Sequence, residues 1–340
     1  MAGQTNAEHF LSIDAQTIDQ HLKQRISLSE AAALGGAIFT LALFVFSPVF
    51  DVNKTDYWVY IRAVNGNPVG FFYAEWLLPI LVPFSKLHPL AGYFLFSLIG
   101  IAGTFFAARV FTGNSGLAFF TYQTIYNIYR GTYLGILLGG LALFWWGTAH
   151  KKWWLAGVGL VFAAAKPQTG FLIALLLFLF KKLSIQDRLK ILIIPSIVVG
   201  LSLLIDPAWP IELLDRIQAN PPDIRGNISL FSSIGPWALL LLLPPLILPL
   251  QRKDRFLGLL AAIPLILPYF QQADLQSLFV FPYGPIILLG NLGFLKMFGW
   301  EALRISLQIV SLLIYCSSLL IPFFCNKERK KGTKYYNLNL

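Results

Sequence analysis

The chain has 340 residues, of which 56% are hydrophobic and only 12% charged, with a mean hydropathy of +0.66. Soluble domains carry about 25% charged residues, so this composition excludes a water-soluble globular protein. The net charge of +10 comes from lysines and arginines gathered in short loops between apolar runs. Such a distribution indicates membrane topology and contact with anionic lipid rather than nucleic-acid binding.

Apolar stretches recur from Ala31 onward. Stretches of about 20 residues are long enough to cross the hydrocarbon core of a bilayer. The runs are continuous rather than alternating, which disfavours a β-barrel. We therefore expect an all-α polytopic membrane protein with about ten or eleven transmembrane helices. We expect a cytoplasmic segment over residues 1–30, a single transmembrane domain over 31–325 and a basic tail over 326–340.

The first span is predicted over residues 31–50, and its basic flank of Lys23 and Arg25 places its start in the cytoplasm. The polar loop 51–76 then lies outside. The segment 76–89 is broken by Pro79 and Pro83, so we expect a short interfacial or re-entrant helix there.

Further apolar segments are predicted at about 90–108, 116–128, 132–149, 153–165, 168–181, 190–206, 231–250, 256–270, 276–295 and 303–325. The two short segments that meet at Lys166-Pro167 each span only about 20 Å as helix, which indicates a cavity in the outer half of the membrane. If successive segments cross the membrane in alternate directions, the basic loops lie on the cytoplasmic side, and Asp56, Arg130, Lys166 and the loop 207–229 lie on the outer side. The basic tail would fall outside, which points to a re-entrant half-helix near Pro282–Pro285.

Several common site signatures are absent from the sequence. The two cysteines form no disulfide framework or metal pattern, and there is no Asp-X-Asp, no phosphate-binding Gly-rich loop with lysine and no His-Glu-X-X-His. We therefore expect neither a bound metal nor a cofactor.

The candidate site residues are the polar groups that the topology gathers on the outer side. Asp56 precedes the aromatic run 57–61 that presses it against the protein, although a solvated turn residue is the ordinary role of a loop aspartate. Lys166 either lines a cavity or reaches the interface as a snorkelling lysine. Arg130 either joins the site or anchors the chain in an aromatic belt. One carboxylate facing several cations suits group transfer from an anionic leaving group.

Four short stretches carry a resemblance to a known family: Asp56-Tyr57-Trp58-Val59-Tyr60-Ile61-Arg62-Ala63, Asn127 to Tyr133, Ala165-Lys166-Pro167-Gln168, and Asn227-Ile228-Ser229-Leu230. In order and spacing they resemble the GT-C superfamily of integral membrane glycosyltransferases, and within it the polyprenol-phosphate-mannose-dependent alpha-mannosyltransferases. The chain departs from the family at Glu75-Trp76-Leu77-Leu78-Pro79 and at Gly131-Thr132-Tyr133.

The resemblance implies that the transmembrane domain is catalytic. It would transfer a hexose, mannose above all, from a polyprenyl-phosphate sugar to a lipid or glycan acceptor with inversion, on the extracytoplasmic side of a bacterial plasma membrane. Asp56 would be the general base, and Lys166, Arg130 and Arg225 would bind the donor phosphate. The substrate-binding residues would be Tyr57, Arg62, Glu75, Asn127, Gln168 and Asn227.

Two other functions are compatible with the composition. A lipid or solute transporter would be expected to keep ionisable residues near the bilayer midplane, whereas here they gather at one face. A non-catalytic protein of the same fold would account for the altered sequence after Gly131.

Overall fold

The computed structural model describes residues 15–219 and 224–336, so parts of the predicted N-terminal segment, of the loop 207–229 and of the basic tail lie outside the described residues. The described chain is all-α and contains no strand; an isolated antiparallel bridge joins Asn227 to Gln271. The predicted fold class is confirmed.

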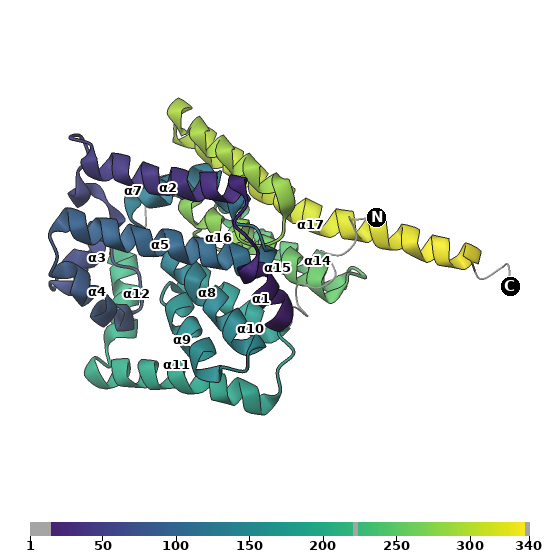
Figure 1. Ribbon diagram of the computed structural model, residues 1–340, viewed down its shortest axis with the longest axis horizontal. Helices are drawn as coiled ribbons and strands as arrows, with labels where there is room; N and C mark the ends of the chain where they lie inside the picture. The colour runs from purple at the N-terminus through teal and green to yellow at the C-terminus, as the bar shows by residue number, and fades with distance from the viewer. Residues whose placement is uncertain (1–14, 220–223, 337–340) are drawn as a thin grey trace.

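The α-helices are α1 (Ala15–Lys23), α2 (Leu28–Phe46), α3 (Asp56–Val64), α4 (Leu78–Ser85), α5 (Pro89–Thr112), α6 (Gly116–Phe119), α7 (Tyr122–Arg130), α8 (Leu134–Ala149), α9 (Trp153–Ala164), α10 (Leu172–Phe180), α11 (Ile185–Ile205), α12 (Trp209–Ala219), α13 (Phe231–Ile234), α14 (Leu243–Ile247), α15 (Arg252–Ile266), α16 (Gln276–Phe279) and α17 (Trp300–Tyr336). Between them lie 3-10 helices over Val52–Lys54, Glu75–Leu77, Ile224–Gly226, Gly235–Leu242, Gln272–Leu275 and Gly284–Phe298, and a π-helical turn over Pro167–Phe171. Figure 1 shows how these helices bundle together.

Four helices of the described chain are long and apolar enough to cross a membrane: Leu28–Phe46, Pro89–Thr112, Ile185–Ile205 and Trp300–Phe323. A fifth is added if α7 and α8, bent by 111°, count as one broken span. Most of the other expected crossings are shorter apolar helices, including Trp153–Ala164, Pro167–Phe180 and Gly284–Phe298. The protein is thus a polytopic membrane protein in which several predicted spans are short or broken helices.

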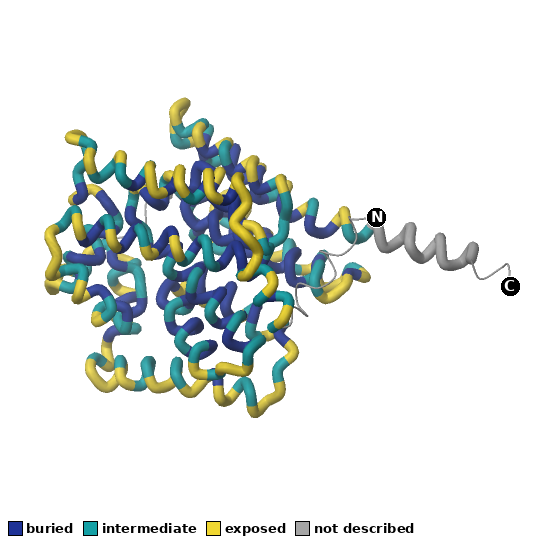
Figure 2. The backbone as a smooth tube through the Cα atoms, viewed as in Figure 1, coloured by how far each residue is buried: buried dark blue, intermediate teal, exposed yellow. Residues whose placement is uncertain are grey.

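The outer helices present apolar side chains away from the protein. Along α11, which lies at the lower edge of Figure 1, Leu189, Ile193, Ile197 and Leu201 are all exposed, whereas α8 in the interior is largely buried (Figure 2). Apolar side chains facing outward along a full helix are expected where the surrounding solvent is lipid.

Glycines allow α5 and α8 to pack closely in the interior. A Cβ built on Gly135 would lie 2.1 Å from the Gly100 carbonyl oxygen, and one on Gly103 would lie 2.2 Å from the Gly135 oxygen. Membrane helices commonly use small residues for such contacts, because packing rather than apolar burial holds them together. This contact sets the distance between α5 and α8.

Ion pairs and hydrogen bonds define two ends of the bundle. At one end, which we call the Glu30 end, Glu30 pairs with Arg109 at 3.1 Å, Asp19 contacts His150 at 3.0 Å, and Arg252 donates to the Phe180 carbonyl at 2.6 Å. At the other, the Asp56 end, Asp56 pairs with Arg130, Lys166 with Asp274, and Glu75 with Arg216 at 2.9 Å. In Figure 1, α3, α4 and α12 lie at the Asp56 end and α1 at the opposite end.

The segment expected as a single crossing over 276–295 instead reverses direction near Pro282. Phe281 stacks on Phe111 at 4.6 Å, and Phe111 lies two residues after Arg109 in the chain, so the strip from Gln272 to Phe281 returns to the Glu30 end. The 3-10 helix Gly284–Phe298 then runs back toward Trp300, and α17 leaves in the opposite direction (Figure 1). The extra reversal brings the end of α17 to the same side of the bundle as α1 (Figure 1).

Candidate active site

A cavity opens at the Asp56 end and contains about 520 Å³ of empty space, part of it open to solvent. Three distant parts of the chain line it: Asp56, Val59, Tyr60, Gly70, Phe72 and Tyr73; Lys166 and Gln168; and Tyr269 and Gln271. The loop 51–76 and the Lys-Pro junction therefore meet at one cavity. The titratable side chains on its wall combine one carboxylate, one ammonium group and a set of phenols.

Asp56 is the first residue of α3, which Thr55 caps by accepting a hydrogen bond from the Trp58 amide at 3.3 Å. Arg130 donates from Nε to Asp56 Oδ1 at 3.0 Å and also from Nη2, while its Nη1 donates to the Lys54 carbonyl at 2.7 Å. The pair is partly buried. Among the described residues Arg130 is not part of the cavity wall, so it supports Asp56 from behind rather than facing a ligand.

The backbone places Arg130 by ending α7 abruptly. Gly131 follows with φ of 59°, in the left-handed region that glycine adopts at helix ends without strain. The Tyr93 hydroxyl donates to the Ile128 carbonyl at 2.5 Å, which ties the last turn of α7 to α5. Arg130 thus reaches α3 from a rigid helix terminus.

Lys166 lies at the break between α9 and α10. It precedes Pro167, and proline keeps the preceding residue out of the helical region; the observed φ of −108° and ψ of 96° are extended. Its Nζ donates to Oδ1 of Asp274, and only 6% of Lys166 and 2% of Asp274 are exposed. The snorkelling alternative is therefore wrong, because this lysine is buried and paired.

Asp274 is the site residue that sequence reasoning missed. It lies in the 3-10 helix Gln272–Leu275, and its Oδ2 accepts a hydrogen bond from Thr169 Oγ1 at 3.0 Å. The expected arrangement of one acid against several cations is corrected to two neutral pairs, Asp56 with Arg130 and Lys166 with Asp274. The sequence signal that could have revealed Asp274 was its place between the apolar segments 256–270 and 276–295, where an unpaired charge costs free energy.

Tyrosines fill the wall between the two pairs. The hydroxyls of Tyr60 and Tyr73 are 3.0 Å apart, and the Tyr133 amide donates to the Tyr60 hydroxyl at 3.1 Å. Lys166 Nζ lies 5.9 Å from the centre of the Tyr73 ring. The Ala74 amide donates to the Ala165 carbonyl at 2.9 Å, so backbone contact also joins the loop 51–76 to the Lys-Pro junction.

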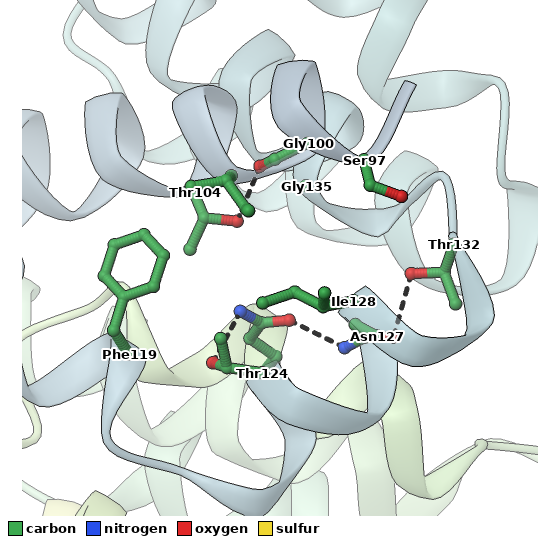
Figure 3. Close-up of a pocket in the computed structure, with 11 residues that line it drawn as sticks. Ser97, Gly100, Thr104, Phe119, Thr124, Asn127, Ile128, Thr132 and Gly135 are labelled. Carbon is green, nitrogen blue, oxygen red and sulfur yellow. Dashed lines mark hydrogen bonds between the residues drawn. The ribbon is translucent and has the colours of Figure 1, made fainter. Parts of the chain in front are cut away.

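Of the six predicted substrate-binding residues, only Gln168 lines this cavity. Asn127 instead lines a second cavity of about 310 Å³ between α5, α7 and α8, where its amide donates to Gln276 Oε1 at 2.6 Å and accepts from Thr132 at 2.8 Å (Figure 3). Its Nδ2 also donates to the Ala273 carbonyl at 3.0 Å. Asn127 is therefore corrected from a sugar ligand to a group that fixes the turn carrying Asp274.

Tyr57, Arg62 and Glu75 lie outside the described wall of the cavity. Tyr57 is buried, and burial raises the pKa of its phenol to about 12, so it remains protonated at physiological pH. Arg62 is partly buried, and its Nε has no hydrogen-bond partner in the described chain. Glu75 accepts from Arg216 at 2.9 Å. Tyr57 and Glu75 therefore contribute to the supporting structure rather than to the cavity wall.

Arg225 and Asn227 also differ from prediction. Arg225 lies over the ring of Trp300 at 5.6 Å from its centre, and within the described chain it is not part of the cavity wall. Asn227 donates to the Pro268 carbonyl at 3.0 Å and accepts from the amides of Ser229 and Phe270, both at 3.0 Å. Its amide is thus occupied in holding the 269–271 loop, which contributes to the cavity wall.

One carboxylate cluster in the described chain could hold a cation. Glu75, Asp206 and Glu212 each place a carboxylate oxygen within 4.8 Å of the others. Arg216 already pairs with Glu75, and none of the three is among the described residues of the cavity wall. The chemistry of the cavity itself rests on Asp56 and Lys166.

Comparison of the chain with family models, with curated proteins and with solved structures finds no match. The function is therefore argued from the cavity. A partly buried carboxylate and a buried ammonium on one wall can accept a proton at one position and stabilise negative charge at another.

Proposed function

We propose that this protein is a membrane glycosyltransferase that moves a hexose, mannose by resemblance, from a polyprenyl-phosphate sugar to a lipid or glycan acceptor with inversion. The observation that supports this most is that Asp56 and Lys166 line one cavity although they come from distant parts of the sequence. These are the two residues to which the family resemblance assigns the general base and the donor-phosphate ligand.

In the proposed reaction, Asp56 accepts the proton of the acceptor hydroxyl as its oxygen attacks the anomeric carbon. The bond from that carbon to the phosphate oxygen breaks, and the phosphate leaves with the electron pair. Lys166 donates hydrogen bonds to the phosphate as its charge grows, and Gln168 can contact sugar hydroxyls. Arg130 orients Asp56 through its two N–H donors.

The distribution of charge supports an extracytoplasmic site. Basic residues lie in the loops after α8 and α10 and at the start of α15, near the Glu30 end and opposite the cavity: Lys151, Lys152, Lys181, Lys182, Arg252 and Lys253. Basic loops mark the cytoplasmic side of a membrane protein, so the cavity would open on the other side of the plasma membrane. That is the side from which an extracytoplasmic lipid-linked donor is reached.

The decisive experiment incubates purified protein in proteoliposomes with a panel of radiolabelled polyprenyl-phosphate sugars and candidate acceptors. Wild-type protein should transfer one sugar, and Asp56→Asn should lower the rate by about 10²–10⁴-fold, the usual contribution of a general base. Asp51→Asn is the matched control, because Asp51 is exposed in the same loop and caps the short helix Val52–Lys54. Full activity of Asp56→Asn would overturn the assignment.

A second candidate function, solute or lipid transport, is favoured by one specific observation. The Lys166–Asp274 pair is buried at a helix broken by a proline, and transporters often bind their substrate at such breaks. Counterflow of solute or lipid by the purified protein in liposomes without any sugar donor would favour transport. Sugar transfer without counterflow would favour the glycosyltransferase.

A further inference from the structure

We propose that Asp274 is a positioning residue of the active site, which holds the ammonium group of Lys166 against the cavity wall so that its free N–H donors face the donor phosphate. The inference rests on the proposed function and adds to it a residue that neither the sequence nor the family resemblance singled out. It concerns a carboxylate that lies behind Lys166 rather than in contact with substrate.

Lys166 is part of the cavity wall, whereas Asp274 is not among its described residues, so the carboxylate approaches the ammonium from the protein side. A lysine ammonium has three N–H donors. One donates to Asp274, which leaves two for a ligand in the cavity.

Asp274 is held in place by contacts other than Lys166. Thr169 donates to its second oxygen at 3.0 Å, which fixes the plane of the carboxylate. The Asp274 amide donates to the Gln271 carbonyl at 2.9 Å, and Asn127 donates to the neighbouring Ala273 carbonyl at 3.0 Å. The carboxylate is therefore anchored independently of Lys166 and can impose a position on it.

An ammonium group as buried as that of Lys166 is costly without a partner, because the interior solvates charge poorly. The carboxylate of Asp274 offsets that cost, so a full positive charge can stand at the cavity wall before any substrate arrives. Groups positioned in advance for developing charge are the most effective stabilisers of a leaving anion.

The test compares Asp274→Asn with Glu30→Gln, which breaks a buried ion pair of the same kind at the opposite end of the bundle. Transfer kinetics are measured per folded molecule against donor concentration. We expect Asp274→Asn to raise the donor KM at least tenfold, and Glu30→Gln to leave it within twofold even where it lowers thermal stability equally. In the Lys166→Met background, Asp274→Asn should change KM by less than twofold, because its effect acts through the lysine.

A second readout does not depend on sugar transfer. Acetylation of Lys166 by an N-hydroxysuccinimide ester is quantified by mass spectrometry relative to exposed Lys54. We expect Asp274→Asn to increase the relative labelling of Lys166 at least fivefold, since the carboxylate no longer holds the Lys166 nitrogen. Unchanged labelling would overturn the positioning role. Increased labelling in a protein that transfers no sugar would leave the pairing standing and refute the proposed function.

If Asp274→Asn does not accumulate, Thr169→Val carries the same test, because it removes one hydrogen bond from the carboxylate with little change of shape. We expect about a threefold rise in both donor KM and Lys166 labelling, in line with the loss of one hydrogen bond. No change in either would overturn the proposal.

Discussion

Removing the positive charge of Lys166 should destabilise the protein through the carboxylate that it leaves behind. In Lys166→Met, Asp274 keeps its hydrogen bond from Thr169 but is only 2% exposed and loses its counter-charge. Breaking a buried pair from one side costs about 3–5 kcal/mol. An ordinary aspartate can escape that cost by taking up a proton, which costs about 4 kcal/mol at pH 7 and only about 1.5 kcal/mol at pH 5.

The expected loss is therefore about 3–4 kcal/mol at pH 7, and it shrinks toward about 1.5 kcal/mol at pH 5. The sign follows because a folded variant that binds an extra proton loses stability as the pH rises. The double variant Lys166→Met/Asp274→Leu removes both charges and should recover most of the loss.

Thermal unfolding of the purified variants in detergent, monitored at both pH values, measures this series. Near-identical melting temperatures of the wild type and Lys166→Met at pH 7 would refute the reasoning. A double variant less stable than the single one would show that shape rather than charge dominates at this position.

Three further predictions concern other parts of the molecule. Gly135→Val should lower the free energy of unfolding by about 1–3 kcal/mol or more, because even a Cβ there would lie 2.1 Å from a backbone oxygen of α5. Gly36 has open space around it, so Gly36→Ala should be neutral or stabilising in the same unfolding assay. Burial lowers the pKa of Lys181, in the loop after α10, to about 8. The free energy of unfolding should therefore rise by up to about 3 kcal/mol between pH 8 and 10.5, and Lys181→Met should abolish that rise. Asn227→Ala should speed amide hydrogen exchange at Phe270, whose N–H it accepts at 3.0 Å, and unchanged exchange would show that the loop is held by other contacts.

Some features of the site followed from the sequence because they depend on local chemistry. Proline after Lys166 forbids a regular helix at that point, and the break was predictable from the dipeptide alone. A partner or a water-filled cavity for the Lys166 ammonium group was also predictable, since a lysine between two apolar segments must find one or the other. The short helix α4 was likewise predictable from the prolines at residues 79 and 83.

The roles of the polar side chains could not be read in the same way. Asn127 and Asn227 both lie near the predicted site, yet their amides are occupied by backbone and side-chain partners far along the chain. Arg130 was predicted to face a phosphate but pairs with Asp56. An amide or guanidinium group has the same local sequence signal in either role, and only the partners that surround it decide which it takes.

The sequence by itself determined that this is an all-α membrane protein, where its charges gather, and where its helices must break. These follow from the cost of placing polar groups in lipid, which acts on each segment separately. Only the tertiary structure decided that Lys166 meets Asp274 and that the chain reverses near Pro282, which brings the end of α17 to the same side of the bundle as α1. Those outcomes depend on which short helices lie side by side, and that choice is made by packing between segments distant in the chain.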